Sequence, residues 1–271
     1  MLYEQIIVPF DGTVEARAAA HIAADLSALF RAPLLLLTSA RSDVPADLAE
    51  LKQRAIGMST TDAEVWVEAA RRPAEAVATA VANHPNPLVV MATHARSSLR
   101  RTMFGNIAQD ILRTVDAPVL ALGPRCVPCD PVDVREVVLS TDGTDTAEAA
   151  TILAAAWSRA LGVRCIVLHV RSPKGAAVDL TRLVTTLKLI GADVETRVID
   201  GDDVVDGILG AVADDSAILV MASHMRHRSD RLTHPSTATR VLHDARVPVL
   251  VQSGSATHGA RWLCDDLRAE G

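Results

Sequence analysis

The sequence contains an internal repeat that divides the chain into two halves of similar length. Three segments of the first half recur in the second with an offset of 130 or 131 residues. They are residues 6–13 and 137–144, 88–94 and 218–224, and 117–120 and 247–250. Because solenoid repeats have only about 20 to 50 residues, each half is predicted to be a complete domain. We expect domains at 1–123 and 135–253, a linker at 124–134 and a C-terminal tail at 254–271.

Each half alternates short apolar segments with segments of helical periodicity. Strands are expected at 5–9, 34–37, 63–68, 88–91 and 119–122, and again at 136–140, 165–169, 193–199, 218–221 and 249–251. Thr13 is the expected N-cap of the first helix, and further helices are expected at 47–58, 73–82 and 104–115. The expected apolar face of the first helix is Val14, Ala18, Ile22, Leu26 and Leu29. This alternation predicts an α/β fold of two tandem domains, each a five-stranded parallel sheet flanked by helices.

Composition narrows the classes of function. Hydrophobic residues make up 49% of the chain but aromatic residues only 3%, which favours an aliphatic core of helices on a buried parallel sheet. The net charge of −6 argues against non-specific binding of nucleic acid. No apolar run approaches the roughly 18 residues of a membrane span, and no signal peptide is apparent. We therefore expect a cytoplasmic protein with no nucleic-acid and no membrane partner.

Polar and small residues follow the carboxyl ends of two expected strands of the first half. Asp11 follows the first strand, and residues 92–95 follow the fourth. Ligands of open α/β sheets bind outside these strand ends where the strand order reverses, so both segments are expected to face one crevice. A loop with three arginines (Arg96, Arg100 and Arg101) then leads to a helix start, where free N–H groups attract anions. An anion site is one interpretation, and an ordinary strand-to-helix turn with a solvated basic loop is the other.

These segments resemble the universal stress protein family, in its tandem two-domain form, over essentially the whole chain. The nucleotide motif of that family is Gly-x2-Gly-x9-Gly followed by Ser or Thr. The same spacing gives Ala92, Ala95, Gly105 and Asn106 in the first half. In the second half it gives Ala222, Met225, Pro235 and Ser236. The spacing is kept in both halves, whereas most of the glycines are replaced.

The resemblance implies a Rossmann-like fold, as in the adenine nucleotide alpha hydrolases, and a site for an adenine nucleotide, ATP with or without Mg²⁺. It implies that Pro9, Phe10 and Asp11 line the nucleoside, with Asp11 at the ribose and the backbone of Ser39 at the adenine. The residues implied at the phosphates are Met91, Ala92, His94, Ala95, Gly105, Asn106 and Ile107, to which Arg96 adds positive charge. The resemblance also implies that the domains pair through their last strands, and a homodimer of whole chains is a further expectation.

The replaced glycines affect the two halves differently. Alanine restricts positive φ and close backbone approach, at a cost of about 1 kcal/mol in an unsuitable φ region. Asn106 keeps a group that can hydrogen-bond an oxygen. In the second half, Pro235 has no N–H to donate, and Met225 places a long side chain where the motif has none. We therefore expect the nucleotide in the first half only.

The leading hypothesis is a stress-response protein that binds an adenine nucleotide as a sensor or regulator and is not an enzyme. No catalytic constellation or metal-ligand set is apparent in the sequence, and Cys126 and Cys129 are interpreted as linker residues rather than half of a metal site. The first alternative is a nucleotide-free member that acts through dimerisation or partner binding. The second is a weak ATP-hydrolysing enzyme on the same fold.

Overall fold

The computed structural model describes most of the chain. The described residues are 2–40, 64–69, 72–93, 106–127, 133–144, 148–173, 178–212, 216–223 and 236–253. The helix expected at 47–58, the tail at 254–271 and Cys129 lie outside them. Among the described helices, none combines the length and the apolar character that a bilayer crossing requires. The domain boundaries expected from the sequence remain a prediction.

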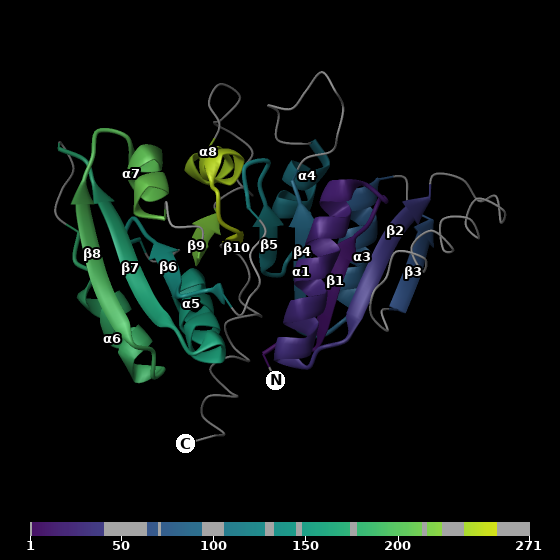
Figure 1. Ribbon diagram of the computed structural model, residues 1–271, viewed down its shortest axis with the longest axis horizontal. Helices are drawn as coiled ribbons and strands as arrows, with labels where there is room; N and C mark the ends of the chain where they lie inside the picture. The colour runs from purple at the N-terminus through teal and green to yellow at the C-terminus, as the bar shows by residue number, and fades with distance from the viewer. Residues whose placement is uncertain are drawn as a thin grey trace.

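Strands and helices alternate as predicted, apart from the segment between β2 and β3, which lies outside the described residues (Figure 1). The first half contains β1 (Gln5–Pro9), α1 (Val14–Phe30), β2 (Leu34–Ala40), β3 (Glu64–Ala69), α3 (Pro73–Asn83), β4 (Pro87–Ala92), α4 (Asn106–Thr114) and β5 (Val119–Leu122). The second contains β6 (Glu136–Ser140), α5 (Glu148–Leu161), β7 (Arg164–Arg171), α6 (Thr181–Leu189), β8 (Val194–Asp200), α7 (Val204–Ala211), β9 (Ala217–Ser223), α8 (Thr237–Asp244) and β10 (Val249–Ser253). Several strands, β7 among them, are longer than their apolar runs because parallel pairing continues into the flanking polar residues.

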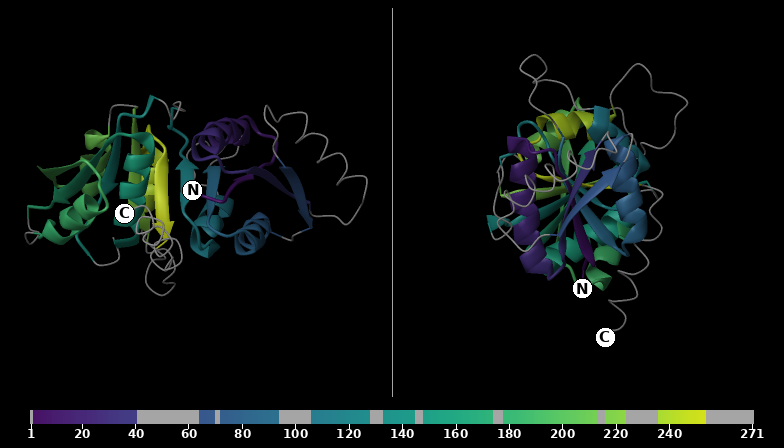
Figure 2. Two further views of the ribbon diagram at one scale, coloured as in Figure 1. Left: turned by 90° about the horizontal axis from the view of Figure 1, so that it is seen from below. Right: turned by 90° about the vertical axis from the view of Figure 1, so that its right-hand side faces the viewer.

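The ten strands of the described residues form one sheet in the order β3-β2-β1-β4-β5-β10-β9-β6-β7-β8. Neighbouring strands are parallel except β5 and β10, which are antiparallel. Helices cover both faces (Figure 2). Buried residues of α1, α5 and α6 share one continuous core with one face of the sheet, and those of α3, α4, α7 and α8 share another with the opposite face. The fold class is therefore α/β as predicted, and the two five-stranded sheets are fused into one.

Helix α1 shows one error in the predicted core. Thr13 caps the helix as expected, since its Oγ1 accepts a hydrogen bond from the N–H of Ala16 at 3.1 Å. Val14 and Leu29, however, are 56% and 42% exposed, so the predicted apolar face was wrong at both ends. The residues that face the sheet are Ala16, Ala19, Ile22, Ala23, Leu26 and Phe30. Small alanines let the helix approach the sheet closely, so side-chain size was a misleading guide to the buried face.

The two halves meet at β5 and β10, through the last strands as the family resemblance implied. Leu120 of β5 lies opposite Leu250 of β10, and both are fully buried. Immediately after β5, Gly123 lies against α8, where a Cβ would come within 2.1 Å of the Leu242 carbonyl oxygen. The chain then follows the second half, because the N–H of Val127 donates to the Arg246 carbonyl at 2.8 Å.

Three buried aromatic rings join the halves on the α1 and α5 side of the sheet. The Trp157 indole N–H donates to the Tyr3 hydroxyl at 2.6 Å. The ring of Phe30 stands edge-on to both, with centroids 5.4 Å from Tyr3 and 5.2 Å from Trp157. Because Trp157 belongs to α5 and the other two rings belong to the first half, this cluster ties α1 to the second half.

We expect Tyr3→Phe to destabilise the protein by about 1–3 kcal/mol, because the substitution removes the Tyr3 acceptor of a buried indole N–H while keeping the ring. Urea unfolding followed by circular dichroism measures the loss. The control is Thr114→Val, which also removes one hydroxyl hydrogen bond, to the Asp110 carbonyl, but at an exposed position. It should change stability by less than about 0.5 kcal/mol. Equal losses of unfolding free energy for the two substitutions would contradict a stabilising role of the Trp157–Tyr3 hydrogen bond.

Burial raises the pKa of the Tyr3 phenol far above its usual value near 10. Because the folded-state pKa lies above that of the unfolded chain, Tyr3 stabilises the fold fully below pH about 10 and loses this contribution as pH rises further. Tyr3 is the only tyrosine, so alkaline titration of the near-ultraviolet absorbance reports on it alone. Tyrosinate should appear only together with unfolding. Its appearance while circular dichroism remains native would contradict the buried position.

Candidate functional site

The strand order reverses between β1 and β4 in the first half. From β1 the chain continues to β2 on one side, and it later returns to β4 on the other. The helices that follow these two strands, α1 and α4, lie on opposite faces of the sheet. The carboxyl ends of β1 and β4 therefore border the crevice in which ligands of this fold class bind.

At the end of β1, Pro9 is half-buried and Phe10 turns its side chain into the core. The Phe10 ring packs with Ala16 of α1 and Val65 of β3. The N–H of Phe10 donates to the Leu37 carbonyl of β2 at 2.8 Å. Phe10 therefore has its backbone carbonyl, rather than its ring, to offer to a ligand at the crevice.

Asp11 lies exposed at the same strand end, at the beginning of α1. Its Oδ1 accepts hydrogen bonds from the Thr13 N–H at 3.0 Å and the Thr13 hydroxyl at 2.7 Å. Gly12 between them has a φ of 81°, which favours glycine. Within the described part of the chain, the hydrogen bonds of Asp11 all go to Oδ1. The turn thus holds the exposed carboxylate in place through Oδ1, and Oδ2 makes no hydrogen bond to the described residues.

The end of β4 is held by β5. Thr93 is buried, and both its N–H and its hydroxyl donate to the Leu122 carbonyl, at 2.9 and 3.2 Å. Met91 is buried in the core, and Ala92 is half-buried as the last residue of β4. Among described non-glycine residues, positive φ occurs at Arg31 and Asn86 and not at Ala92. Alanine at the first motif position therefore causes no backbone strain.

The remaining predicted site residues are only partly described. Ile107 is 52% exposed at the start of α4, the helix that begins at Asn106. The backbones of Ser39 and Asn106 are described, at the ends of β2 and α4, but not their side chains. His94, Ala95, Arg96 and Gly105 lie outside the described residues. The structure thus brings the residues of β1 and β4 to one strand edge, and the role of the loop between β4 and α4 stays a prediction.

The second half repeats the β1 turn in detail. Asp142 Oδ1 accepts from the N–H and the hydroxyl of Thr144, again at 3.0 and 2.7 Å. A contact between two residues that the sequence analysis did not connect completes this edge. Buried His169 has Nδ1 at 3.0 Å from the Thr141 carbonyl, and the Thr141 hydroxyl accepts from the Gly143 N–H at 3.0 Å. No sequence signal marks this pair, because β6 and β7 are brought together only by the sheet.

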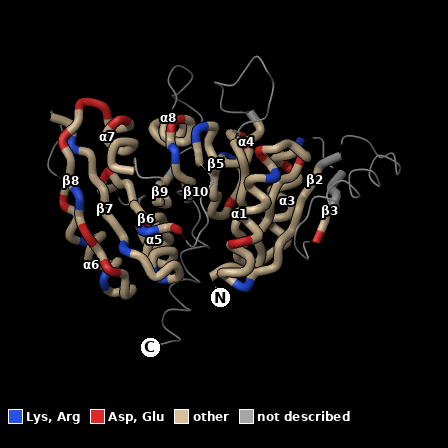
Figure 3. Tube along the Cα trace, in the orientation of Figure 1, with Lys and Arg blue, Asp and Glu red and all other residues tan. Residues whose placement is uncertain are grey.

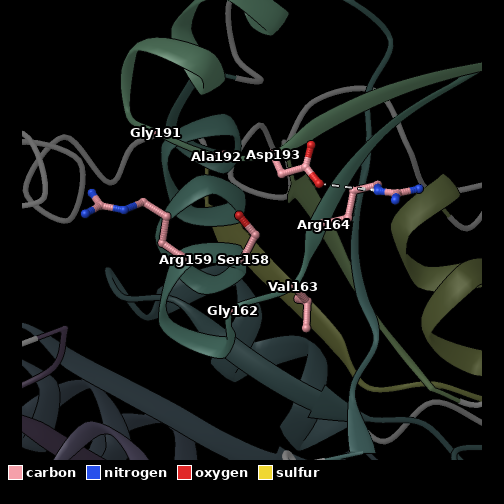
Figure 4. A pocket seen from close by; sticks show the side chains of 8 residues that line it. All are labelled: Ser158, Arg159, Gly162, Val163, Arg164, Gly191, Ala192 and Asp193. Atoms are coloured by element: carbon pink, nitrogen blue, oxygen red, sulfur yellow. Dashed lines mark ion pairs between the residues drawn. The ribbon is translucent and has the colours of Figure 1, made fainter.

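A hollow of about 300 Å³ lies elsewhere, at the amino ends of β7 and β8 beside the last turn of α5 (Figure 4). Arg164 in its wall is already paired, with Asp193 at 3.5 Å and Glu195 at 2.9 Å. Arg159 and Arg164 point away from each other in Figure 4. Since its polar groups do not converge, we assign this hollow no ligand. In the described residues, no three His, Cys, Asp or Glu side chains are placed to hold a metal ion.

A substitution at Gly143 tests how tightly the turn after β6 is packed. Its φ is +78°, and a Cβ at this position would lie 2.0 Å from Cγ1 of Val178. Gly162 has a similar φ of +67° but has no atom within 4 Å of such a Cβ. We expect Gly162→Ala to cost about 1–2 kcal/mol from backbone strain alone. Gly143→Ala should cost about 1–3 kcal/mol more from overpacking, measured by urea unfolding, and equal costs would contradict the contact.

Comparison with known proteins identifies the first half. Residues 2–123 match the model of the universal stress protein family. No curated protein sequence matches the chain. In structure, the chain is similar to a universal stress protein from Archaeoglobus fulgidus DSM 4304, with a TM-score of 0.69 and 17% identity over 93% of this chain and 98% of that one. A putative universal stress protein from Pseudomonas aeruginosa UCBPP-PA14 gives a TM-score of 0.60 and 15% identity over 97% and 98%.

A shorter structure, a universal stress protein from Archaeoglobus fulgidus in complex with dAMP, is 22% identical and covers 43% of this chain and 96% of that one, with a TM-score of 0.35. The two full-length similarities, at their low identities, show the fold. The family match and that fold agree with each other and with the repeat in the sequence. Residues 2–123 therefore match the universal stress protein family, and the chain as a whole has the fold of the two longer universal stress protein structures.

Proposed function

We propose that the first half binds an adenine nucleotide at the carboxyl edge of β1 and β4 and that the protein acts as a nucleotide-dependent regulator. The observation that carries this proposal is the position of the Asp11 carboxylate. It is exposed, fixed through Oδ1 by Thr13, and placed beside the point where the strand order reverses. Carboxylate oxygens accept hydrogen bonds from hydroxyl groups, so Oδ2 suits the ribose of a nucleoside.

The base and the phosphates would then follow the sheet edge in opposite directions from Asp11. On the β2 side, the backbone at Ser39 would meet the adenine, next to Pro9 and Phe10. On the β4 side, Met91 and Ala92 lead to the loop with His94, Ala95, Arg96 and Gly105. The start of α4, at Asn106 and Ile107, would attract the phosphates through its free N–H groups and partial positive charge.

The replaced glycine at Ala92 is compatible with this arrangement. Its φ is not positive, so a Cβ is accommodated without strain at the end of β4. ATP with Mg²⁺ and the smaller AMP both remain within the proposal, because no described metal-ligand set selects between them. The chain's own contribution would be to bind and orient the nucleotide, with Arg96 neutralising phosphate charge.

A nucleotide-free function through partner binding is the second candidate, and one observation favours it. The Asp–Gly–Thr turn has the same hydrogen bonds in both halves, including the second half, where all three motif glycines are replaced. A purely structural turn would explain both copies. Binding measurements separate the two candidates.

A nucleotide that binds only the folded state must raise its stability, by about 2.7 kcal/mol when the free concentration is 100 times Kd. We therefore expect the thermal midpoint of the full chain to rise with AMP or Mg²⁺-ATP. Asp11→Asn keeps an oxygen for Thr13 but replaces Oδ2 with a donor, and it should weaken binding about 10- to 100-fold through the lost charge-assisted hydrogen bond. Absence of any shift at millimolar nucleotide would favour the nucleotide-free candidate. Unchanged binding by Asp11→Asn would contradict the assigned position.

A further inference from the structure

In the second half, the turn that follows β6 is covered by a residue of the same half. Val178, in the segment between β7 and α6, is half-buried and rests on Gly143, whose missing Cβ would lie 2.0 Å from Cγ1. Valine is stiff at χ1, so this contact cannot be relieved by a simple side-chain rotation. The backbone groups of the same turn are also engaged, since the Thr141 carbonyl meets His169 and the Gly143 N–H meets Thr141.

The end of β7 is covered as well. The carbonyl of its last residue, Arg171, accepts a hydrogen bond from the Gly201 N–H at 3.1 Å. The Arg171 guanidinium donates two hydrogen bonds to the Asp200 carboxylate, at 2.6 and 2.9 Å. Val170 packs so closely under α7 that a Cβ on Gly207 would come within 2.7 Å of it. By the 131-residue offset, Val170 corresponds to Ser39, the residue whose backbone is proposed to meet the adenine. In the second half the side chain at this position is buried against α7.

The start of α8 has its polar groups committed to neighbours within the second half. Ser236 accepts from the Thr239 N–H at 3.2 Å and lies 2.9 Å from the Thr239 hydroxyl. Arg240 in the first turn donates to Asp203 at 3.0 Å, and Asp203 caps α7. Of the described side chains at this helix start, Arg240 is therefore paired with a carboxylate and Ser236 with the first turn of α8.

Charge at this edge also disfavours phosphate. Acidic residues gather at the turn between β8 and α7 (Figure 3). In the described residues, the acidic side chains that follow the strand ends are Asp142, Asp179, Asp200, Asp202, Asp203 and Asp206, against Arg171 and Arg240. Hydrogen bonds from Arg171 and Arg240 lower the pKa of Asp200 and Asp203, so both carboxylates stay ionised at neutral pH. Among the described residues of this edge, acidic side chains therefore outnumber basic ones, which disfavours phosphate there. Arg226, Arg228 and Arg231, in the loop before α8, lie outside the described residues.

We infer that the second half excludes nucleotides and serves as the permanent structural partner of the first, so that the chain binds one nucleotide and Val178, Asp203 and Arg240 are among the residues that exclude a second. This inference rests on the function proposed for the first half. The contacts that make the second half a partner are those of β10 with β5, Trp157 with Tyr3, and α8 with Gly123.

The test is equilibrium dialysis of the full chain with radiolabelled AMP, using a matched pair of substitutions in the repeated turn. Wild-type protein should bind one AMP per chain. Asp142→Asn should leave both the stoichiometry and Kd unchanged, whereas Asp11→Asn should weaken binding at least tenfold. In the wild type, AMP should slow hydrogen exchange of the backbone amides in 9–13 and leave those in 140–144 unchanged.

Two AMP molecules per chain, or weaker binding by Asp142→Asn than by the wild type, would overturn the inference. Slower exchange in 140–144 on addition of AMP would do the same. Failure of the proposed function would give a different result. None of the three proteins would bind AMP, and AMP would change hydrogen exchange in neither 9–13 nor 140–144. That outcome would reject the site in the first half while agreeing with a closed edge in the second.

Discussion

The antiparallel pairing of β5 with β10 determines the rest of the architecture. It turns two five-stranded parallel sheets into one sheet whose central strands are covered on both faces. An antiparallel pair relates its two strands by a rotation about an axis perpendicular to the sheet, so equivalent helices fall on the same face. Both hydrophobic cores therefore run across the junction without interruption. Because β5 and β10 pair with each other, neither of them is an exposed edge strand.

Helix α1 connects this junction to the candidate site. It begins at the turn that holds the Asp11 carboxylate and ends at Phe30, in the aromatic cluster with Tyr3 and Trp157. The position of the carboxylate therefore depends on a helix that is anchored at its far end by the second half. The closed strand edge of the second half and its contacts with α1 are consistent with a division of labour between the two copies.

Local sequence patterns predicted the elements well where the chemistry is local. The cap at Thr13 depends on neighbouring residues alone, and the structure has it as predicted. The face of α1 was mispredicted at Val14 and Leu29, because burial of a helix depends on which surface the sheet presents. For the site, the sequence located Asp11 and Ala92, but whether alanine is tolerated at position 92 depends on its φ, which β4 sets.

The sequence by itself determined the repeat, the order of strands and helices, and the strand ends that carry Asp11 and Asp142, because these follow from periodicity and spacing along the chain. Only the tertiary structure decided that Val178 covers Gly143, that Arg240 pairs with Asp203, and that the halves share one sheet. Each of these contacts joins residues more than 30 positions apart or depends on strand pairing. Two copies with the same local turn thus acquire different surroundings, and it is these surroundings that distinguish their proposed roles.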